Sequence, residues 1–297
     1  MSQANRPSFI QLPDSDNYAT VIDFLVSHFP HISKQTWLQR AANGKLFWKD
    51  GASIAIDTQY QANRLVGYYR EVVAEPKIPF EETIIESNSH FIIAHKPPFL
   101  PVMPGGVFVN ECLQERLIKR TGIKALQAVH RLDRDTSGLV LLSTNPDTRH
   151  QYHQLFADRT ISKRYQAVSN LKSSESIVGK TWQVKNYLRR SVPQFLFENC
   201  EDSNEGQYAE SHIQCIEQSA KKALFTLSPL TGRTHQLRLH MMSIGFSIEN
   251  DRFYPTLQPK QPDNYQQPMQ LHAKSLAFTD PISGKALEFH SPFSLRL

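Results

Sequence analysis

The sequence contains little cysteine, only 12 glycines and no long apolar run. Its three cysteines, Cys112, Cys200 and Cys215, are an odd number at wide spacing, which fits reduced thiols better than a disulfide framework or a CxxC metal clip. The apolar runs at 91–94 and 139–142 are far shorter than the ~20 residues that span a bilayer. We therefore expect no structural zinc, no disulfide framework and no membrane-spanning helix.

Several enzyme signatures are also missing. The sequence has no GxxxxGK(S/T) loop, no GxGxxG after a strand and no GxSxG elbow. P-loop enzymes, dehydrogenases and serine hydrolases are therefore unsupported, and we expect no nucleotide cofactor. The first twenty residues lack the basic and apolar regions of a signal peptide, so we expect a cytoplasmic protein without membrane association.

What the chain does have is an unevenly distributed excess of basic residues. It carries 33 Lys+Arg against 28 Asp+Glu, a net charge of +5. Segment 147–190 has nine basic and three acidic residues, whereas 191–220 has no Lys or Arg and six acidic residues. Such segregation predicts a basic face, typical of proteins that bind a polyanion, although an ordinary solvated surface fits the charge pattern equally well.

Two prolines, Pro76 and Pro79, interrupt any regular element and indicate a domain boundary. We predict a small N-terminal domain over residues 1–78 and a larger domain over 79–297. In the larger domain, strand-like segments outnumber helical ones, which favours an α+β fold with a mixed sheet over a regularly alternating α/β fold. The predicted strands are 91–94, 138–143, 164–168, 213–216, 223–227 and 275–278, with one predicted helix at 110–120.

The small N-terminal domain shows two helical patterns followed by a hairpin. Apolar residues at helical spacing over 21–26 predict one helix, and Ser33 is placed to cap a second helix that ends at Asn43-Gly44. Residues 45–51 predict a short strand closed by an Asp-Gly turn. Far along the chain, residues 255–270 are rich in proline and glutamine and predict a long surface loop.

The densest group of chemically active side chains lies just before the strand at 138–143. There Asp133 stands between Arg131 and Arg134. A carboxylate flanked by guanidinium groups stays ionised, which suits a nucleophile or an electrostatic stabiliser better than a general acid. An isolated Arg-Leu-Asp is more often a structural ion pair, so this segment needs support from elsewhere in the chain.

Two other enzyme classes fit the same segment less well. Residues 133–137 approximate the DxDx(T/V) loop of haloacid-dehalogenase-like phosphotransferases, which need a divalent ion. That loop follows an apolar strand, whereas here the apolar strand comes after it. A glycosidase could use Asp133 and Asp135, but carboxylates two residues apart do not reliably flank a sugar at the required separation of roughly 5–10 Å.

A second polar group covers residues 229–240, after the strand at 223–227. Gly232 allows a close turn, and the arginines, histidines and glutamine that follow are donors suited to phosphates, base edges or a carboxylate. His235 and His240 are five residues apart, which suits packed or hydrogen-bonded histidines better than a zinc pair. We therefore predict no metal site here.

Together, the two polar groups resemble the RluA-type pseudouridine synthase family. His130-Arg131-Leu132-Asp133 with Thr136-Ser137-Gly138 resembles the family signature, and 231–240 is close to its Gly-Arg-Thr-His-Gln-Ile-Arg-Val-His segment. Further matching segments occur in the family's order, and the resemblance covers about residues 82–292. These further segments are 93–98, 163–165 and 271–284.

The resemblance implies a fold, an activity and a set of site residues. It implies a pseudouridine synthase-like α+β domain with a mixed, mainly antiparallel sheet and flanking helices, plus a small N-terminal α/β appendage. It also implies an enzyme that isomerises a uridine of ribosomal or transfer RNA to pseudouridine without cofactor or metal. Asp133 would be the catalytic carboxylate and Arg238 its partner, while Tyr165 would stack on the target base and is a candidate base for the C5 proton. The implied RNA contacts are Arg131, which would fill the gap left by the flipped uridine, and Lys163, Arg164, Arg233, His235 and Gln236.

The sequence departs from the family pattern in two places. Residues 245–251 lack the usual proline and glycine of that turn, and the usual glycine after 96–98 is absent. Both places avoid the predicted catalytic residues, so we expect altered RNA contacts rather than lost catalysis. Residues 18–73 resemble only faintly the small two-helix RNA-binding domain that many members carry at the N-terminus. The alternative function is a catalytically silent RNA-binding or ribosome-assembly factor with the same fold. We expect a monomer whose partner is an RNA stem-loop.

Overall fold

The computed structural model describes residues 2–15, 17–173, 175–193 and 195–297. The chain divides into two compact units, and within its described part no helix is long and apolar enough to cross a membrane. The division after Pro76 lies two residues from the predicted boundary, and a short later segment belongs to the smaller unit. The units are residues 1–76 with 105–110, and residues 77–104 with 111–297.

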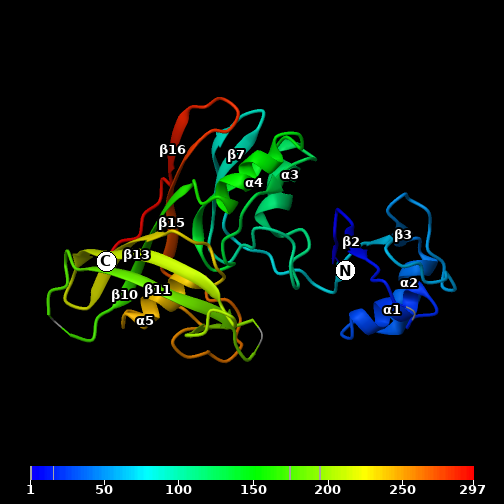
Figure 1. Cartoon of the computed structure of the whole chain (residues 1–297), viewed down its shortest axis with the longest axis horizontal. Coiled ribbons are helices and arrows are strands. Elements are labelled where there is room, and N and C mark those ends of the chain that lie inside the picture. The colour runs from blue at the N-terminus through cyan, green and yellow to red at the C-terminus, as the bar shows by residue number, and fades with distance from the viewer. Residues whose placement is uncertain (1, 16, 174, 194) are drawn as a thin grey trace. The chain divides into compact units, whose positions relative to one another are not determined.

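The smaller unit combines two helices with a three-stranded antiparallel sheet (Figure 1). Helix α1 (Val21–His28) begins with a capping box, in which the Thr20 side chain accepts from the Asp23 N–H and the Asp23 carboxylate accepts from the Thr20 N–H. Helix α2 (Lys34–Ala42) begins at the predicted cap, Ser33, whose hydroxyl accepts a backbone hydrogen bond. The strands are β2 (Ser8–Gln11), β4 (Leu65–Tyr68) and β3 (Leu46–Trp48) in sheet order, beside the short pair β1 (Ser2–Gln3) and β5 (Glu71–Val72).

The larger unit is built on an eleven-stranded sheet, which confirms the predicted mixed and mainly antiparallel α+β fold. Among the described strands, only one pairing is parallel. Each of the six predicted strands lies within a strand of this sheet. In order across the sheet these are β12 (Phe197–Cys200), β11 (Thr181–Arg190), β13 (Gln207–Gln218), β14 (Lys222–Pro229), β10 (Ser162–Asn170), β15 (Leu271–Thr279), β9 (Ser137–Ser143), β7 (Phe91–Lys96) and β6 (Thr83–Ser87), with β16 (Ala286–His290) beside β15 and β8 (Gln127–Ala128) beside β9.

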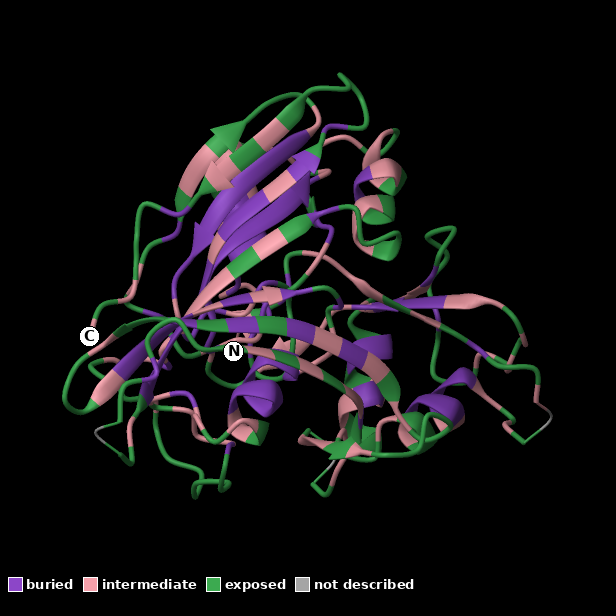
Figure 2. Cartoon of the chain, turned by 60° about the vertical axis from the view of Figure 1, so that its left-hand side comes forward, coloured by how far each residue is buried: buried purple, intermediate pink, exposed green. Residues whose placement is uncertain are grey.

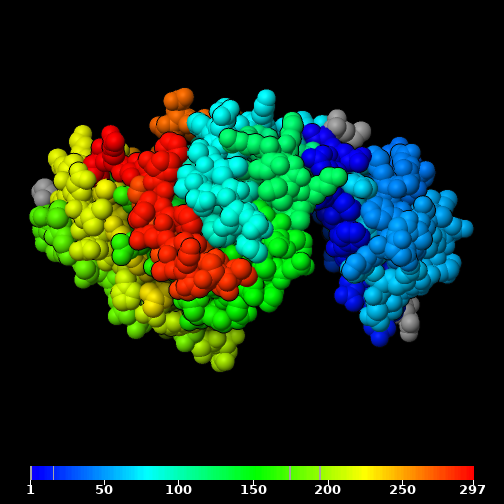
Figure 3. Space-filling view, turned by 90° about the horizontal axis from the view of Figure 1, so that it is seen from above, coloured from blue at the N-terminus to red at the C-terminus, as the bar shows by residue number. Residues whose placement is uncertain are grey.

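Strand β15 comes late in the chain but lies in the middle of the sheet, between β10 and β9. Figure 3 shows the last residues of the chain, in red, at the surface between yellow and cyan segments that come earlier in the chain. The parallel pairing joins β9 to β15 at Gly138 and Ala273. Gly138 has φ +117°, and a Cβ atom there would lie 2.3 Å from the Ala273 carbonyl oxygen. Only glycine fits this close approach.

Strands β7 and β9 are buried along their whole length, and Figure 2 shows central strands of the sheet in purple. On one face of β9, Leu139 and Leu141 pack with Tyr152 of helix α4 (Arg149–Ala157). Val140 and Leu142 point to the opposite face and are also fully buried. Burial on both faces explains why this strand is an unbroken apolar run.

Two further helices complete the larger unit. Helix α3 (Leu113–Thr121) begins three residues later than the predicted helix at 110–120, and Gly122 ends it in the left-handed conformation. Helix α5 (Gln236–Ser243) packs against the sheet through Leu237 and Met241, which share a core cluster with residues of β10, β13 and β14 (Figure 1). The predicted loop at 255–270 contains no helix or strand.

Candidate active site

A pocket of about 90 Å³ lies where β10, the loop before β9 and the start of α5 come together. Among the predicted site residues, only Arg164 does not line the pocket. Arg164 is exposed on the other face of β10, because side chains alternate along a strand and Lys163 and Tyr165 face the pocket. The predicted residues in the lining are Arg131, Asp133, Lys163, Tyr165, Arg233, His235, Gln236 and Arg238.

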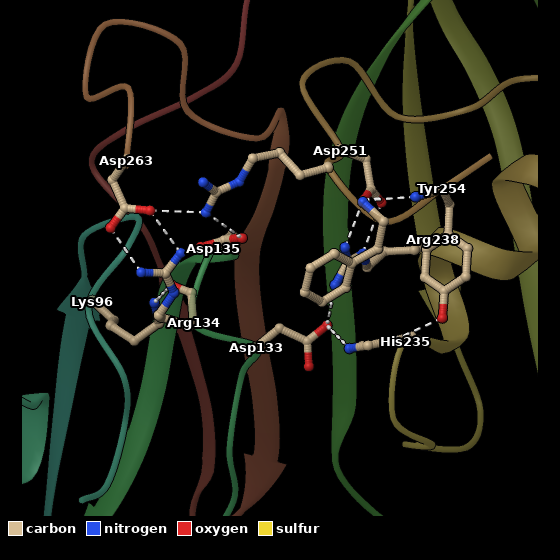
Figure 4. Close-up of polar contacts among 11 residues, drawn as sticks. Lys96, Asp133, Arg134, Asp135, His235, Arg238, Asp251, Tyr254 and Asp263 are labelled. Atoms are coloured by element: carbon tan, nitrogen blue, oxygen red, sulfur yellow. Dashed lines mark hydrogen bonds and ion pairs between the residues drawn. The ribbon is translucent and has the colours of Figure 1, made fainter. Parts of the chain in front are cut away.

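Asp133 and Arg238 face each other in this pocket (Figure 4). Nη1 of Arg238 lies 3.4 Å from Oδ2 of Asp133. The arginine side chain is 2% exposed and the aspartate side chain 20% exposed. Because little water separates the two groups, their attraction is stronger than that of a surface ion pair. The arrangement stabilises a negative charge on Asp133 at the wall of the pocket.

A second carboxylate, Asp251, fixes the guanidinium of Arg238. It accepts hydrogen bonds from Nε at 2.7 Å and from Nη2 at 2.5 Å. The rings of Phe253 and Tyr254 pack near the same guanidinium, 4.7 and 5.2 Å from its Cζ. Burial alone would lower the pKa of Arg238, but Asp251 and the nearby Asp133 raise it. Asp251 thus orients Arg238 and leaves Nη1 for Asp133. Asp251 belongs to the altered turn at 245–251, so the expectation that this turn avoids the predicted catalytic residues was wrong.

His235 lies between Asp133 and Tyr254. Its Nε2 is 3.9 Å from Oδ2 of Asp133, and its Nδ1 is 2.9 Å from the hydroxyl of Tyr254. His235 has φ +58° directly before α5, a conformation uncommon for residues other than glycine. Burial lowers the pKa of this imidazole, although the charge of Asp133 opposes the shift. His235 is thus a buried side chain that lies next to Asp133 in the wall of the pocket.

Lys96 holds the backbone of the loop that carries Asp133. It is fully buried, and its Nζ donates to three backbone carbonyl oxygens at 2.7–2.9 Å, one of which belongs to Arg134. Burial lowers the pKa of Lys96 to about 7, while the charges of Asp135 and Asp133 oppose the shift. Three donors require the protonated ammonium. In the sequence, Lys96 stood out only as part of the family segment at 93–98.

His130 ties the beginning of the same loop to β9. Its Nε2 accepts a hydrogen bond from the backbone N–H of Leu141 at 3.0 Å, and its ring stacks on Phe156 at 4.4 Å. Burial and the nearby Lys163 lower the pKa of His130 to about 3, so the imidazole is neutral and can accept this bond. His130 therefore orients the loop from within the protein.

The long loop at 255–270 also reaches this region. Asp263 accepts two hydrogen bonds from Arg134 and one from Arg252 at 2.8 Å. Arg134 also lies 2.9 Å from Asp135. Figure 4 shows these groups beside Lys96 and Asp133. The loop is thus tied to the residue that follows Asp133, a relationship that the sequence analysis missed.

The predicted RNA contacts differ in how far protein partners occupy them. Gln236 is 3% exposed, and its side-chain amide forms four hydrogen bonds within the protein. Lys163 donates to the carbonyl of Thr231 at 3.0 Å, and burial lowers its pKa to about 8. Both side chains hold the turn at 231–233. Arg131 is exposed and lines the pocket.

Tyr165 enters the pocket from β10 where the register with β15 shifts between Arg164 and Tyr165. Burial raises the pKa of its phenol, and the charge of Asp133 raises it further. The phenol therefore stays protonated at neutral pH, which favours a stacking role over the role of a base. Within the described chain, no group of three or more His, Cys, Asp or Glu side chains is arranged to hold a metal ion.

Residues 90–243 match the family model described as RNA pseudouridylate synthase. The matched segment covers more than half of the chain and contains all nine predicted site residues. The chain belongs to this family. It is therefore an RNA uridine isomerase with an RNA substrate.

Individual relatives agree with this assignment. Ribosomal large subunit pseudouridine synthase D of Zymomonas mobilis is 32% identical over 228 residues, which cover 72% of this chain and 70% of that protein. Dual-specificity RNA pseudouridine synthase RluA of Escherichia coli is 28% identical and aligns with 70% of this chain and 92% of its own. The synthase is thus of the RluA type.

The fold is shared with solved structures as well. Human RNA Pseudouridylate Synthase Domain Containing 1 superposes with a TM-score of 0.58 at 21% identity, covering 74% of this chain and 86% of that one. Human RNA Pseudouridylate Synthase Domain Containing 4 gives 0.55 at 23% identity, covering 71% and 88%. At these identities the likeness concerns the fold alone.

Proposed function

We propose that Asp133 is the catalytic carboxylate of this synthase and that its substrate is a uridine in a stem-loop of ribosomal or transfer RNA. One observation carries the assignment: among the described residues that line the pocket, Asp133 is the only carboxylate. It also faces a buried arginine, Arg238, which stabilises its negative charge.

The reaction makes clear demands on these groups. The bond between N1 and C1′ breaks, the uracil turns, a bond forms between C5 and C1′, and the C5 proton leaves. An ionised Asp133 can attack C1′, attack C6 or take a proton from the sugar, and each route needs the negative charge that Arg238 stabilises. In each route, Arg238 and Asp251 hold the carboxylate oriented toward the substrate.

Tyr165 and Arg131 serve the target base in this proposal. Tyr165 stacks on the uracil, for which a protonated phenol on the wall of the pocket is suited. Arg131 is exposed at the same pocket, and its guanidinium fills the space that the uridine leaves when it flips out of its stack.

The RNA class rests on the names of relatives. One relative is a ribosomal large subunit pseudouridine synthase, and others are dual-specificity RNA pseudouridine synthases. These names support ribosomal or transfer RNA as the substrate class. A catalytically silent binding factor would have no need of Asp133 and Tyr165, and both residues are present in the pocket.

The test measures tritium release from RNA labelled at uridine C5, with chelator present. The RNA comes from a strain that lacks this gene, so that the target uridine is unmodified. We expect release by the wild type and by Asp147→Asn, which alters an exposed carboxylate outside the pocket. We expect Asp133→Asn to release less than about 1% as much.

Two outcomes would contradict the proposal. Release by Asp133→Asn at the wild-type rate would remove Asp133 from the mechanism. Binding of the RNA by the wild type without any release would favour the silent binding factor on these substrates.

A further inference from the structure

A second pocket, of about 360 Å³, adjoins the candidate active site. The two pockets share part of their walls, including the side chains of Arg131, Tyr165 and Arg233. A ligand in the second pocket therefore lies directly beside a base that stacks on Tyr165. Nothing in the reaction itself requires this second space.

The charge of the second pocket is strongly one-sided. Among the described residues, its lining has four cationic side chains, Arg131, Arg159, Lys163 and Arg233, and no carboxylate. Two of these are engaged with the backbone: Lys163 donates to the Thr231 carbonyl at 3.0 Å, and Nε of Arg233 donates to a carbonyl at 3.0 Å. Arg131 and Arg159 are exposed, and neither guanidinium forms a hydrogen bond or ion pair with a residue in the described chain. The pocket thus offers two free guanidinium groups to an anion.

Arg159 adopts a backbone conformation that favours glycine. It follows helix α4 with φ +60°, and the next residue, Thr160, donates its N–H to the Leu155 carbonyl at 3.0 Å. Helices commonly end with glycine at such a position, because a Cβ atom disfavours the left-handed region. An arginine here is less favourable for the backbone than glycine. Backbone strain of this kind occurs often at positions whose side chains have a function.

The remaining wall of the pocket includes apolar side chains. Phe156, whose ring stacks on His130, and Leu230, which is 42% exposed, both line the pocket. Exposed apolar surface next to free guanidinium groups fits a nucleotide, which combines an apolar base face with an anionic phosphodiester.

We propose that the second pocket binds the nucleotide adjoining the target uridine and that Arg159 contacts its phosphodiester. This inference rests on the proposed function, because it needs an RNA whose target uridine occupies the first pocket. Since Arg131 and Tyr165 belong to both walls, one strand can occupy the two pockets at once. Arg159 is then a binding residue for the substrate, separate from the residues that act on the uracil.

The test compares the full-length wild type with Arg159→Gly and Lys285→Ala, using the tritium-release assay on RNA from the gene-deletion strain. We expect Arg159→Gly to raise KM about tenfold or more, to keep kcat within about twofold, and to weaken the salt dependence of kcat/KM by about one ion. Its melting temperature should equal or exceed that of the wild type, because glycine suits this backbone better. Lys285→Ala removes an exposed cation outside both pockets and should behave as the wild type.

Several results would overturn the inference. An Arg159→Gly enzyme with wild-type KM and salt dependence would do so while leaving the proposed function intact, as would a fall in kcat with KM unchanged. If Arg159→Gly folds poorly, Arg159→Asn repeats the test, since asparagine tolerates the left-handed region. If even the wild type releases no tritium, the proposed function fails, and filter binding of the same RNA by wild type and Arg159→Gly tests the pocket alone.

Discussion

Asp263 accepts hydrogen bonds from both terminal nitrogens of Arg134, at 2.7 and 2.9 Å. This pair joins the long loop at 255–270 to the residue that follows Asp133. Two residues further along the same loop, the ring of Tyr265 packs edge-on against Phe99, with centroids 5.3 Å apart. A loop without regular structure is thus fixed at two points, and one of them bears on the position of Asp133.

We expect Asp263→Asn to slow the chemical step while leaving RNA affinity nearly unchanged. The substitution removes the charge that holds Arg134, so the Asp133 loop can shift, and a misplacement of ~1 Å can lower a rate by up to about 10²-fold. Single-turnover rates at saturating RNA should fall about tenfold or more. Glu288→Gln, which alters an exposed carboxylate on β16, should leave them unchanged.

A double-mutant cycle tests whether the pair acts as one unit. If it does, Arg134→Met with Asp263→Asn is no slower than the slower single variant. Additive losses would contradict the coupling, and a loss of RNA affinity without a slower rate would instead identify Asp263 as an RNA contact.

Asp251 should matter for activity although it does not line the pocket. Asp251→Ala leaves the buried guanidinium of Arg238 with only the longer contact to Asp133, so we expect unfolding in urea to show a loss of about 3–5 kcal/mol.

Arg238→Lys should lower activity more than about 100-fold, because a single ammonium cannot bond both carboxylates as the planar fork does. Full activity in Arg238→Lys would contradict this role.

From the lowered pKa of Lys96 we expect pH to have opposite effects on activity and on stability. Its pKa is lowered from 10.5 to about 7 by burial, so the folded protein binds fewer protons than the unfolded chain between these values. The contribution of Lys96 to the free energy of unfolding therefore rises with pH across this window. Loss of the proton also removes one donor to the loop of Asp133, so activity should fall as pH rises through about 7. Lys96→Met should be slower than the wild type, and its activity should not fall as pH rises through about 7. A pH profile of activity identical to that of the wild type would contradict this role of Lys96.

A comparison of two glycines distinguishes the energetic cost of a steric clash from the cost of backbone strain. Gly138 and Gly179 both have positive φ, at +117° and +82°, but only Gly138 has the backbone of Ala273 where a Cβ atom would lie. We expect Gly179→Ala to cost about 1–2 kcal/mol of unfolding free energy and Gly138→Ala more than about 4 kcal/mol. Urea unfolding of both variants measures the difference, and equal losses would show that the approach of β9 to β15 tolerates a methyl group.

The sequence predicted the parts of the fold where the local signal is strong. The unbroken apolar runs of β7 and β9 and the Ser33 cap of α2 are such signals. Helix α4 was not predicted, because Tyr152 is its only buried residue and its other side chains are mostly polar. Strand β11 was also missed, although exposed polar residues such as Lys185 alternate with the partly buried Trp182 and Val184 along its first half.

The candidate site divides in the same way. The closeness of Asp133 and Arg238 follows from the family segments that contain them, and the structure places them 3.4 Å apart. Asp251 and Asp263 could not be found from spacing, because each lies in an irregular loop and meets an arginine that tertiary folding brings to it. The one signal that could have indicated Asp251 is a general rule. A buried arginine that contacts a carboxylate in a pocket needs a further anion to compensate its buried charge.

The place of β15 in the sheet has a consequence for the protein while it is being made. Asp133 and Tyr165 lie near the strands β9 and β10 that flank β15, and β15 is translated more than a hundred residues after them. A nascent chain that stops before residue 271 contains every predicted catalytic residue but lacks the strand that joins their two halves of the sheet. We therefore expect a chain that ends before residue 271 to leave the pocket unassembled and to modify no RNA.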